Sequence, residues 1–194
     1  MLYTRKGDNG MTGTFGCDQK ISKSSAIAEA LGALDETNSF LGFCKAKSDE
    51  LRIMNNEIGV KEIIHNVQQN LFIIQAEVAG AEKNIGGEKV KDLEEIIDWA
   101  EKELPEIKTF FISGATELSA LFDTARTIAR RAERRVVEAG EPAFAKSSSV
   151  AKEGKVKIGK NSLAYLNRLS SLLYALARLS AYKSGAKEES PSYK

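Results

Sequence analysis

The chain of 194 residues carries 28 Lys and Arg against 27 Asp and Glu, which leaves a formal net charge of +1, and 42% of its residues are hydrophobic. This balance gives no support to nucleic acid or a membrane surface as a bulk partner, so any positive site must be a local concentration of charge. No apolar run approaches the length of about 18 residues that a membrane span needs, and no signal-peptide pattern is present. The two cysteines lack CxxC spacing and fit a reducing compartment, so we expect a cytoplasmic protein.

Residues 1–20 form the first distinctive segment, in which glycine recurs at every third position with threonines in between. The glycines are Gly7, Gly10, Gly13 and Gly16, and the threonines are Thr4, Thr12 and Thr14. Glycine lets backbone N–H groups approach a ligand closely, threonine adds hydroxyl donors, and Arg5 and Lys6 add positive charge. This composition predicts a nucleotide-binding loop that folds over phosphates, although it lacks the P-loop pattern. A flexible terminus is the alternative.

Residues 22–47 and 57–82 place apolar side chains at helical spacing and are predicted to form two long helices. The first carries Asp35 beside Leu31 and Leu34. A carboxylate there needs a partner if it is buried, which a later arginine-rich helix could supply, or else it is simply exposed. His65, in the second helix, is the only histidine, and one histidine cannot form a metal cluster. We therefore expect it on the surface or satisfied in the core.

The second half of the chain predicts three more helices. Residues 90–104 form one that ends before Pro105, and an aromatic segment, 110–114, leads into another that begins near residue 115. Residues 145–160 are rich in Ser, Gly and Lys and predict a mobile loop. Residues 161–183 form the last helix, with Asn167 beside its leucine stripe, and the polar residues 184–194 predict a flexible tail.

The predicted helix that follows residue 115 is unusually rich in arginine between residues 122 and 137. Its charged residues of interest are Arg126, Arg130, Arg131, Glu133 and Arg134. Four of them, all but Arg131, fall within about a quarter of the helix circumference, at the edge of an apolar stripe. A guanidinium grips phosphate in bidentate fashion, so this stripe is a candidate phosphate site. A surface helix whose arginines only make salt bridges is the alternative.

These elements amount to about five helices, with no credible strand, internal repeat or domain boundary. The sequence therefore predicts an all-α fold, an up-and-down five-helix bundle in a single domain over residues 1–194. The loop 145–160 is then an insertion within the bundle.

The chemistry that these residues allow is limited. The candidate site combines the Gly/Thr loop, Lys23, the arginine helix and Asn167, which suggests that it binds a polyphosphate. No histidine lies in it, no cysteine lies beside a base, and no carboxylates recur at metal-ligand spacing. A reaction here should need only positioning and stabilisation of a phosphate leaving group, with a substrate that is itself a strong nucleophile.

Four segments closely resemble the PduO-type ATP:cob(I)alamin adenosyltransferases. They are YTRKGDNGMTGTFG at 3–16, LGALDETNSFLG at 31–42, ARTIARRAERRVV at 125–137 and YLNRLSSLLYALAR at 165–178. They occur in the family's order and span nearly the whole chain. The resemblance implies a homotrimer of five-helix bundles, each with a ferritin-like four-helix core plus an extra helix, and with active sites between subunits. It also implies transfer of the 5′-deoxyadenosyl group of ATP to the cobalt of cob(I)alamin, with release of triphosphate.

The resemblance further implies roles for individual residues. Those that would wrap the phosphates of ATP are Thr4, Arg5, Lys6, Gly7, Asp8, Thr12, Gly13 and Lys23. Those that would contact ATP from the helices are Arg130, Arg131, Glu133, Arg134 and Asn167. Arg126 would pair with Asp35 across the subunit interface, beside the corrinoid, and Phe110 would close the lower face of the corrin. The catalytic group would be Arg126, Arg130, Glu133 and Asp35.

The same resemblance implies the cofactors and partners. Mg²⁺ is expected with ATP, held mainly by phosphates and water and not by protein ligands. A reductase that supplies the electron and a B12-dependent acceptor enzyme could be protein partners.

The sequence departs from the family at Ser113-Gly114-Ala115, where Pro-Gly-Gly is usual, at Thr37 and Ser171, and in a longer loop at 145–160. The assignment of Phe110 over Phe111 rests on spacing to Arg126. Two other functions stay open: a non-catalytic bundle that senses ATP or carries a corrinoid, and a helical interaction protein whose arginines make only interfacial salt bridges.

Overall fold

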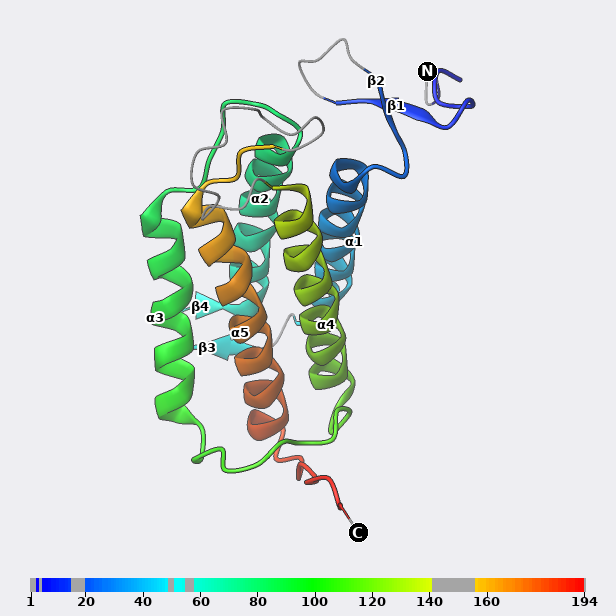
Figure 1. Ribbon diagram of the computed structural model, residues 1–194. Helices are drawn as coiled ribbons and strands as arrows, with labels where there is room; N and C mark the ends of the chain where they lie inside the picture. Colours follow the sequence, from blue (N-terminus) through cyan, green and yellow to red (C-terminus); the bar gives the residue numbers. More distant parts are fainter. Residues whose placement is uncertain are drawn as a thin grey trace.

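The computed structural model describes residues 3, 5–14, 20–48, 51–54, 58–140 and 156–193. Its helices are α1 (Ala26–Ala46), α2 (Val60–Val78), α3 (Gly87–Glu103), α4 (Glu117–Ala139) and α5 (Lys160–Lys183). Successive helices run in opposite directions along one long bundle (Figure 1). The five predicted helices are thus confirmed, with ends that differ by a few residues from the predicted ones.

Short strands occupy two places where the sequence predicted none. β1 (Met11–Gly13) pairs antiparallel with β2 (Lys20–Ser22), and β3 (Arg52–Ile53) pairs antiparallel with β4 (Ile58–Gly59). The prediction of a chain without strands was therefore wrong. Two or three paired residues carry no alternating apolar pattern, because backbone hydrogen bonds and not side-chain burial define them.

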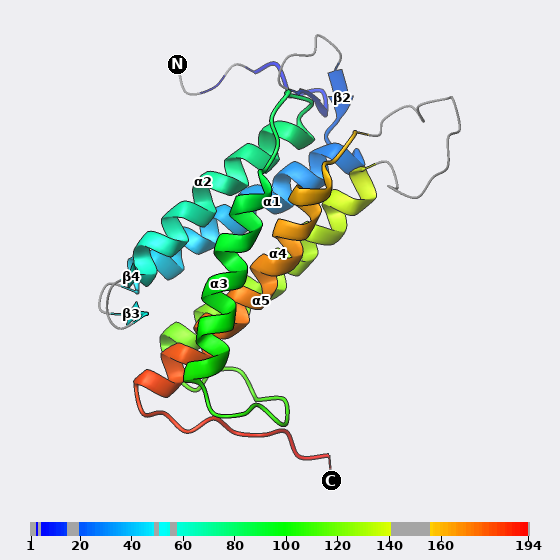
Figure 2. The same cartoon turned by 90° about the vertical axis from the view of Figure 1, so that its left-hand side faces the viewer.

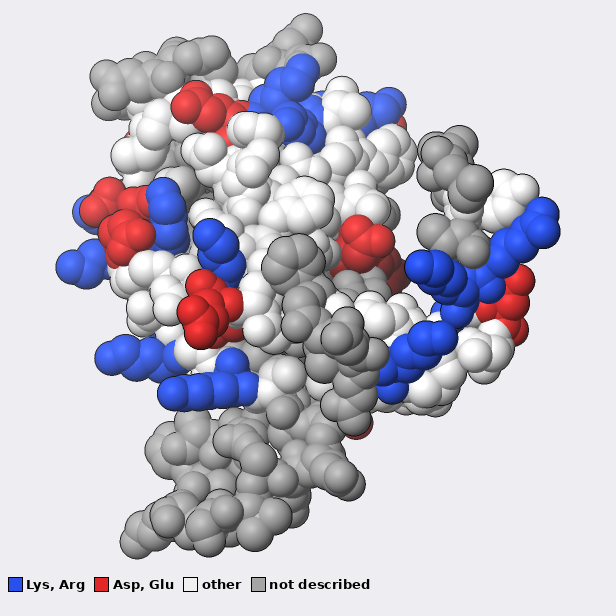
Figure 3. All heavy atoms as spheres, turned by 90° about the horizontal axis from the view of Figure 1, so that it is seen from above, with Lys and Arg blue, Asp and Glu red and all other residues white. Residues whose placement is uncertain are grey.

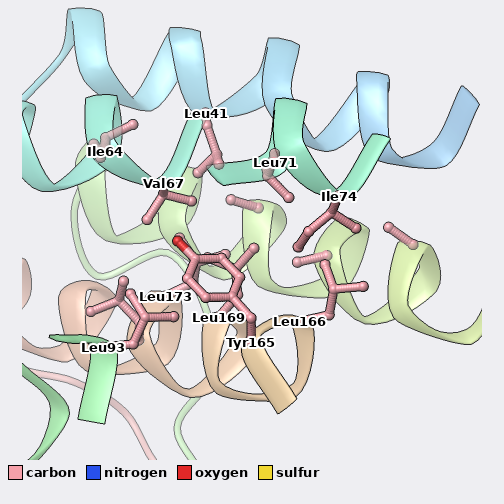
Figure 4. Packing of buried hydrophobic residues seen from close by; sticks show 14 of the residues in the cluster. Leu41, Ile64, Val67, Leu71, Ile74, Leu93, Tyr165, Leu166, Leu169 and Leu173 are labelled. Atoms are coloured by element: carbon pink, nitrogen blue, oxygen red, sulfur yellow. The ribbon is translucent and has the colours of Figure 1, made fainter. Parts of the chain in front are cut away.

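The core lies between α1, α2, α4 and α5, and α3 packs against α5 (Figures 1 and 2). Figure 4 shows Leu41, Leu71 and Leu169, from three different helices, in the same apolar interior as the ring of Tyr165. Tyr165 is fully buried, and its hydroxyl accepts a hydrogen bond from Asn70 Nδ2 at 3.1 Å. A buried hydroxyl needs such a partner, so this bond allows a large polar ring in the middle of an apolar core.

The start of α5 is fixed by a side chain from α2 and not by a cap of its own. Gly159 is the N-cap residue, and its N–H donates to Glu77 Oε1 at 2.7 Å. Ser162 donates to the other oxygen of the same buried carboxylate. A negative charge at a helix N-terminus satisfies free N–H groups and complements the helix dipole. Glu77 therefore anchors the helix that carries Asn167.

The C-terminal segment packs against the bundle, although its polar composition predicted a flexible tail. The Ile112 N–H donates to the Glu189 carbonyl at 2.8 Å, and the Glu188 carboxylate forms an ion pair with Arg178. The amino-acid composition did not predict this packing, because an ion pair and a main-chain hydrogen bond hold the segment and an apolar face does not. In the predicted loop 145–160, residues 145–155 lie outside the described part. Val156 pairs with the end of α4, where its N–H donates to the Ala139 carbonyl at 3.1 Å.

No helix in the described ranges is both long enough and sufficiently apolar to cross a membrane.

We predict that Cys44 resists alkylation in the folded protein. Its side chain is fully buried in the core, and this burial raises the pKa of the thiol to about 12. Since the thiolate is the reactive form, iodoacetamide at pH 8 should modify Cys44 roughly a thousandfold more slowly in the native state than in urea. Mass spectrometry of a Cys17→Ser variant would measure this rate for Cys44 alone. Similar rates in both states would contradict the packing described for α1.

Candidate functional site

A cavity of about 930 Å³ opens at the end of the bundle where α3 ends and α4 begins. Basic side chains from α4 line one wall, and aromatic side chains from the 104–113 loop, α5 and the C-terminal segment line the others. These residues are Arg126, Arg130, Phe110, Phe111, Tyr174 and Tyr193. Lys108 adds a third basic side chain, and Glu101 and Asp123 add two carboxylates. The cavity therefore combines an excess of positive charge with flat apolar surfaces, which suits a large, partly anionic ligand.

The arginines of α4 serve two different sides of the helix. Arg126 and Arg130 line the cavity. Arg131 instead forms an ion pair with Glu36 of α1, and Arg134 Nη1 donates to the Arg130 carbonyl at 3.0 Å. Periodicity had placed Arg131 apart from the other three. The structure shows that this difference turns it towards α1.

Glu133 and Asn167, which the sequence assigned to one site, do come together. Asn167 Nδ2 on α5 donates to Glu133 Oε1 on α4 at 3.1 Å. Arg168 extends the contact, because its Nη1 donates to Asn167 Oδ1 at 2.8 Å and its Nε donates to Glu94 Oε1 on α3 at 2.8 Å. A polar row therefore links α4, α5 and α3 along the face that carries Arg130. The sequence had suggested no role for Arg168, whose place beside Asn167 at the edge of the leucine stripe was the available signal.

Beside the cavity lies a buried group of charges that sequence reasoning missed, and one of them, Asp123, also lines the cavity. Arg178 on α5 and Asp123 on α4 are only 2% and 4% exposed, and Arg178 Nη2 donates to Asp123 Oδ2 at 2.5 Å. Glu188 forms a second ion pair with Arg178, and Arg126 Nε lies 3.8 Å from Asp123 Oδ1. The signal in the sequence was an arginine set among leucines and alanines on an otherwise apolar helix, since such a charge must find a partner.

Tyr174 lies at this junction between the cavity and the buried charges. The guanidinium carbons of Arg178 and Arg126 lie 5.0 and 6.0 Å from its ring centroid. Burial raises the pKa of Tyr174, although the nearby Arg178 opposes the shift. Burial also raises the pKa of Glu188, and Arg178 again acts in the opposite direction. The phenol is therefore neutral at physiological pH and presents a hydrogen-bonding hydroxyl and an aromatic face to the cavity.

The aromatic segment before α4 presents Phe110 and Phe111 differently. Phe110 is 77% exposed, whereas Phe111 is half-buried with its ring 5.6 Å from the guanidinium carbon of Arg178. Both line the cavity. Phe111 is thus fixed by the buried charges, and Phe110 is the ring left free to meet a ligand.

The N-terminal segment folds into a compact turn around Lys23. Gly10 N–H donates to the Gly7 carbonyl at 3.2 Å, and Lys23 N–H donates to the Gly10 carbonyl at 2.9 Å. A Cβ on Gly7 would lie 3.1 Å from Lys23 Nζ, so glycine allows the ammonium to approach the turn. Arg5 has φ +58° and lies beside Tyr3. The structure thus brings Gly7 and Lys23 together, as one binding site would require.

The other residues predicted for this segment differ in how exposed they are. Lys6, Asp8 and Gly13 are exposed, and Thr12 is half-buried. Thr4 lies outside the described residues. The segment extends beyond the N-terminal end of α1 (Figures 1 and 2), and its basic side chains project to one side of the bundle in Figure 3.

Asp35 is exposed on α1, and the carboxylate that Arg126 meets within one chain is that of Asp123. His65 is exposed on α2, as predicted, with Lys45 Nζ 3.0 Å from its Nδ1. Within the described ranges, no three His, Cys, Asp or Glu side chains are grouped so that they could hold a metal ion.

A family model described as cobalamin adenosyltransferase matches residues 2–180. The corrinoid adenosyltransferase of Bacillus subtilis is 35% identical over 191 residues, which cover 95% of this chain and 88% of that protein. The corrinoid adenosyltransferase PduO of Citrobacter freundii is 34% identical over 186 residues, which cover 91% of this chain but 49% of that protein. The chain therefore spans about half the length of the PduO proteins that it matches.

Among solved structures, the fold is similar to that of a variant PduO-type ATP:corrinoid adenosyltransferase from Lactobacillus reuteri complexed with cobalamin and ATP. The TM-score is 0.81 at 27% sequence identity, and the match covers 100% of this chain and 97% of that one. A second variant of the same enzyme, complexed with ATP, gives a TM-score of 0.77 at 26% identity, with 98% and 100% covered.

Proposed function

Since the chain belongs to the cobalamin adenosyltransferase family, we propose that it transfers the 5′-deoxyadenosyl group of ATP to the cobalt of cob(I)alamin and releases triphosphate. The observation that carries this proposal is the cavity that faces Arg126 and Arg130 on one side and Phe110 on the other. A corrinoid needs a broad apolar surface, and a triphosphate needs fixed cations nearby.

The reaction matches the side chains that are present. The electron pair of Co(I) attacks C5′ of the ribose, the C5′–O bond breaks, and triphosphate leaves with the bonding electrons. No proton has to be removed from the nucleophile, so no general base is required. This agrees with the described lining of the cavity, whose ionisable side chains are arginines, Lys108, carboxylates and tyrosines, with no histidine or cysteine among them. The protein's tasks are to align the two substrates and to stabilise the charge on the departing phosphate.

The helix residues divide these tasks. Arg130 faces the cavity with a guanidinium that can hold a phosphate oxygen, and the Glu133–Asn167 contact offers polar groups for the nucleoside on the same face. Arg134 and Arg131 lie further along α4, where they can meet the phosphates of ATP. Exposed Phe110 would cover the lower face of the corrin and keep an axial ligand from the cobalt, which makes the cobalt easier to reduce.

The same proposal includes a homotrimer with active sites between subunits. Arg5, Lys6, Gly7, Asp8, Thr12, Gly13 and Lys23 would close over the phosphates together with Thr4. The N-terminal segment projects beyond the bundle (Figure 3), which supports a role on the helices of a neighbouring chain. Exposed Asp35 would then reach Arg126 of the next subunit. A reductase and a B12-dependent acceptor enzyme are the protein partners that fit this chemistry.

Mg²⁺ would accompany ATP. The described residues offer no cluster of three or more ligating side chains, which fits an ion that keeps its waters and is held by the phosphates. When bound, Mg²⁺ would neutralise part of the charge on the triphosphate, and the arginines of α4 would neutralise the rest.

An anaerobic assay tests the proposal. Chemically reduced cobalamin, ATP and Mg²⁺ are mixed with the protein, and the loss of Co(I) absorption is followed with the appearance of a light-sensitive alkylcobalamin and of triphosphate. Formation of both products supports the transferase. If no product forms but calorimetry shows that ATP still binds, the result would favour a protein that senses ATP or carries a corrinoid. If ATP does not bind either, the result would favour a helical interaction protein.

We predict that Phe110→Ala lowers kcat about tenfold and changes the KM for ATP less than about twofold, because the ring meets the corrinoid alone. The variant Phe111→Ala distinguishes the role of Phe111 from that of Phe110, because Phe111 packs on Arg178. That variant should lower the melting temperature, whereas Phe110→Ala should not. Equal kinetics for Phe110→Ala and the wild type would transfer the corrinoid role to another residue.

A further inference from the structure

Four charged side chains of alternating sign form a row from the C-terminal segment to the cavity. Glu188 pairs with Arg178, Arg178 Nη2 donates to Asp123 Oδ2 at 2.5 Å, and Asp123 Oδ1 lies 3.8 Å from Arg126 Nε. Of the four, Asp123 and Arg126 line the cavity. The row therefore connects a segment at the end of the chain to a side chain of the candidate site.

The two residues in the middle of the row, Arg178 and Asp123, are buried. Their burial restricts where the residues at its two ends, Glu188 and Arg126, can lie. Arg178 and Asp123 are 2% and 4% exposed. A charge removed from water is tolerated only where opposite charges and hydrogen bonds surround it, so each position in the row depends on its neighbours. Because Asp123 is shared between two guanidiniums, a change at Arg178 alters the pull of Asp123 on Arg126.

Besides Asp123, Arg126 has the ring of Tyr174 as a neighbour. Its Nε is buried without a hydrogen-bond partner, and the Tyr174 ring lies 6.0 Å below its guanidinium carbon. The same ring lies 5.0 Å from Arg178. Asp123 and Tyr174 are thus the neighbours that limit where the Arg126 guanidinium can lie. No hydrogen bond to its Nη1 or Nη2 comes from the described residues, so these groups can meet a ligand or a second carboxylate.

We propose that Asp123 and Arg178 are positioning residues that hold Arg126 on the wall of the cavity, and that Glu188 completes the row from the C-terminal segment. The inference rests on the proposed function, in which Arg126 lies beside the corrinoid. Asp123 supplies its carboxylate from the same chain as Arg126, so Arg126 is placed before any neighbouring subunit or substrate arrives. A displaced Arg126 should then weaken the use of the corrinoid substrate more than the use of ATP.

The test is Glu188→Gln, which removes one charge from the row without touching the cavity lining. Arg178 then has Asp123 as its remaining carboxylate partner in the row and draws it away from Arg126. We expect the KM for cob(I)alamin to rise about three- to tenfold, with the KM for ATP unchanged. Asp123→Asn should show the same selectivity with a larger effect. Glu103→Gln, an equal loss of charge on an exposed residue in the last turn of α3, is the matched control.

A second readout needs no substrate. Nitrogen relaxation of the Arg126 Nε–H group, in protein labelled at arginine, reports how well the side chain is fixed. Glu188→Gln should increase its mobility, and Glu103→Gln should leave it unchanged.

The outcomes separate this inference from the proposed function. If the wild-type chain shows no turnover, the proposed function fails, and the relaxation of Arg126 still tests the row. If the wild type is active, unchanged corrinoid kinetics in Glu188→Gln would overturn the inference. An equal rise in both KM values would also overturn it, because a general loss of structure would explain that result.

Discussion

Replacing Arg130 with alanine is expected to lower kcat about a hundredfold or more and to leave the bundle folded. Its side chain is exposed at the cavity, and within the described residues no hydrogen bond or ion pair involves its guanidinium. The residue is therefore free to bind a ligand, and its removal leaves no buried partner unsatisfied. In the proposed reaction, the charge on the departing triphosphate develops in the transition state, so the loss should appear in kcat more than in the KM for ATP.

Two further variants sharpen this prediction. Arg130→Lys keeps the charge but loses the planar fork, and it should retain an intermediate rate. Arg135→Ala removes an exposed arginine from the same helix, where it pairs with Glu138, and it should remain close to wild type. The anaerobic assay and thermal melting are measured for all three proteins. Near-normal kcat in Arg130→Ala would remove this arginine from the mechanism.

The helices could be predicted because their apolar residues recur at the period of a helix over many turns. Ala125, Ala129 and Ala132 illustrate this, since they recur at helical spacing along α4 and each is buried. The β1–β2 and β3–β4 pairs could not be predicted, because backbone pairing over two or three residues needs no side-chain pattern.

The candidate site could be predicted only in part, for a related reason. A helical pattern gives the angle of each side chain around its own axis, and it placed Arg126 and Arg130 at the edge of the packed face. It does not give the identity of the neighbouring helix. That Arg131 would meet Glu36 of α1, and that Glu133 would meet Asn167 of α5, depends on how the helices pack. The pairing of Asp35 with Arg126 depends on a second chain and stays a prediction.

The hydrophobic pattern did not predict the buried charges. Asp123 follows buried Phe122 on α4, and Arg178 stands among buried leucines and alanines on α5. A hydrophobic pattern treats such residues as interruptions, yet each is the other's partner across the helix interface. The sequence contained both halves of the pair without any spacing that could join them.

Asp123→Asn is expected to lower the free energy of unfolding by about 3 kcal/mol. The amide has nearly the shape of the carboxylate, so the packing of α4 on α5 is retained and only the charge is lost. Arg178, at 2% exposure, then keeps a single carboxylate partner, Glu188, on a segment outside the helices. For a chain of this length the loss corresponds to a fall in melting temperature of roughly 10 °C.

The physical cause can be separated from a simple packing defect. Arg178→Met combined with Asp123→Leu removes the two most deeply buried charges together and leaves Glu188, whose side chain is 15% exposed, without its partner. The double variant should be more stable than Asp123→Asn, because the charge that stays unpaired can reach water and the fully buried guanidinium is gone. Urea unfolding of wild type, the single variant and the double variant measures the three free energies. If Asp123→Asn unfolds at the wild-type midpoint, the Asp123–Arg178 pair makes no net contribution to stability. If the double variant is the least stable of the three, the packing of these side chains matters more than their charge.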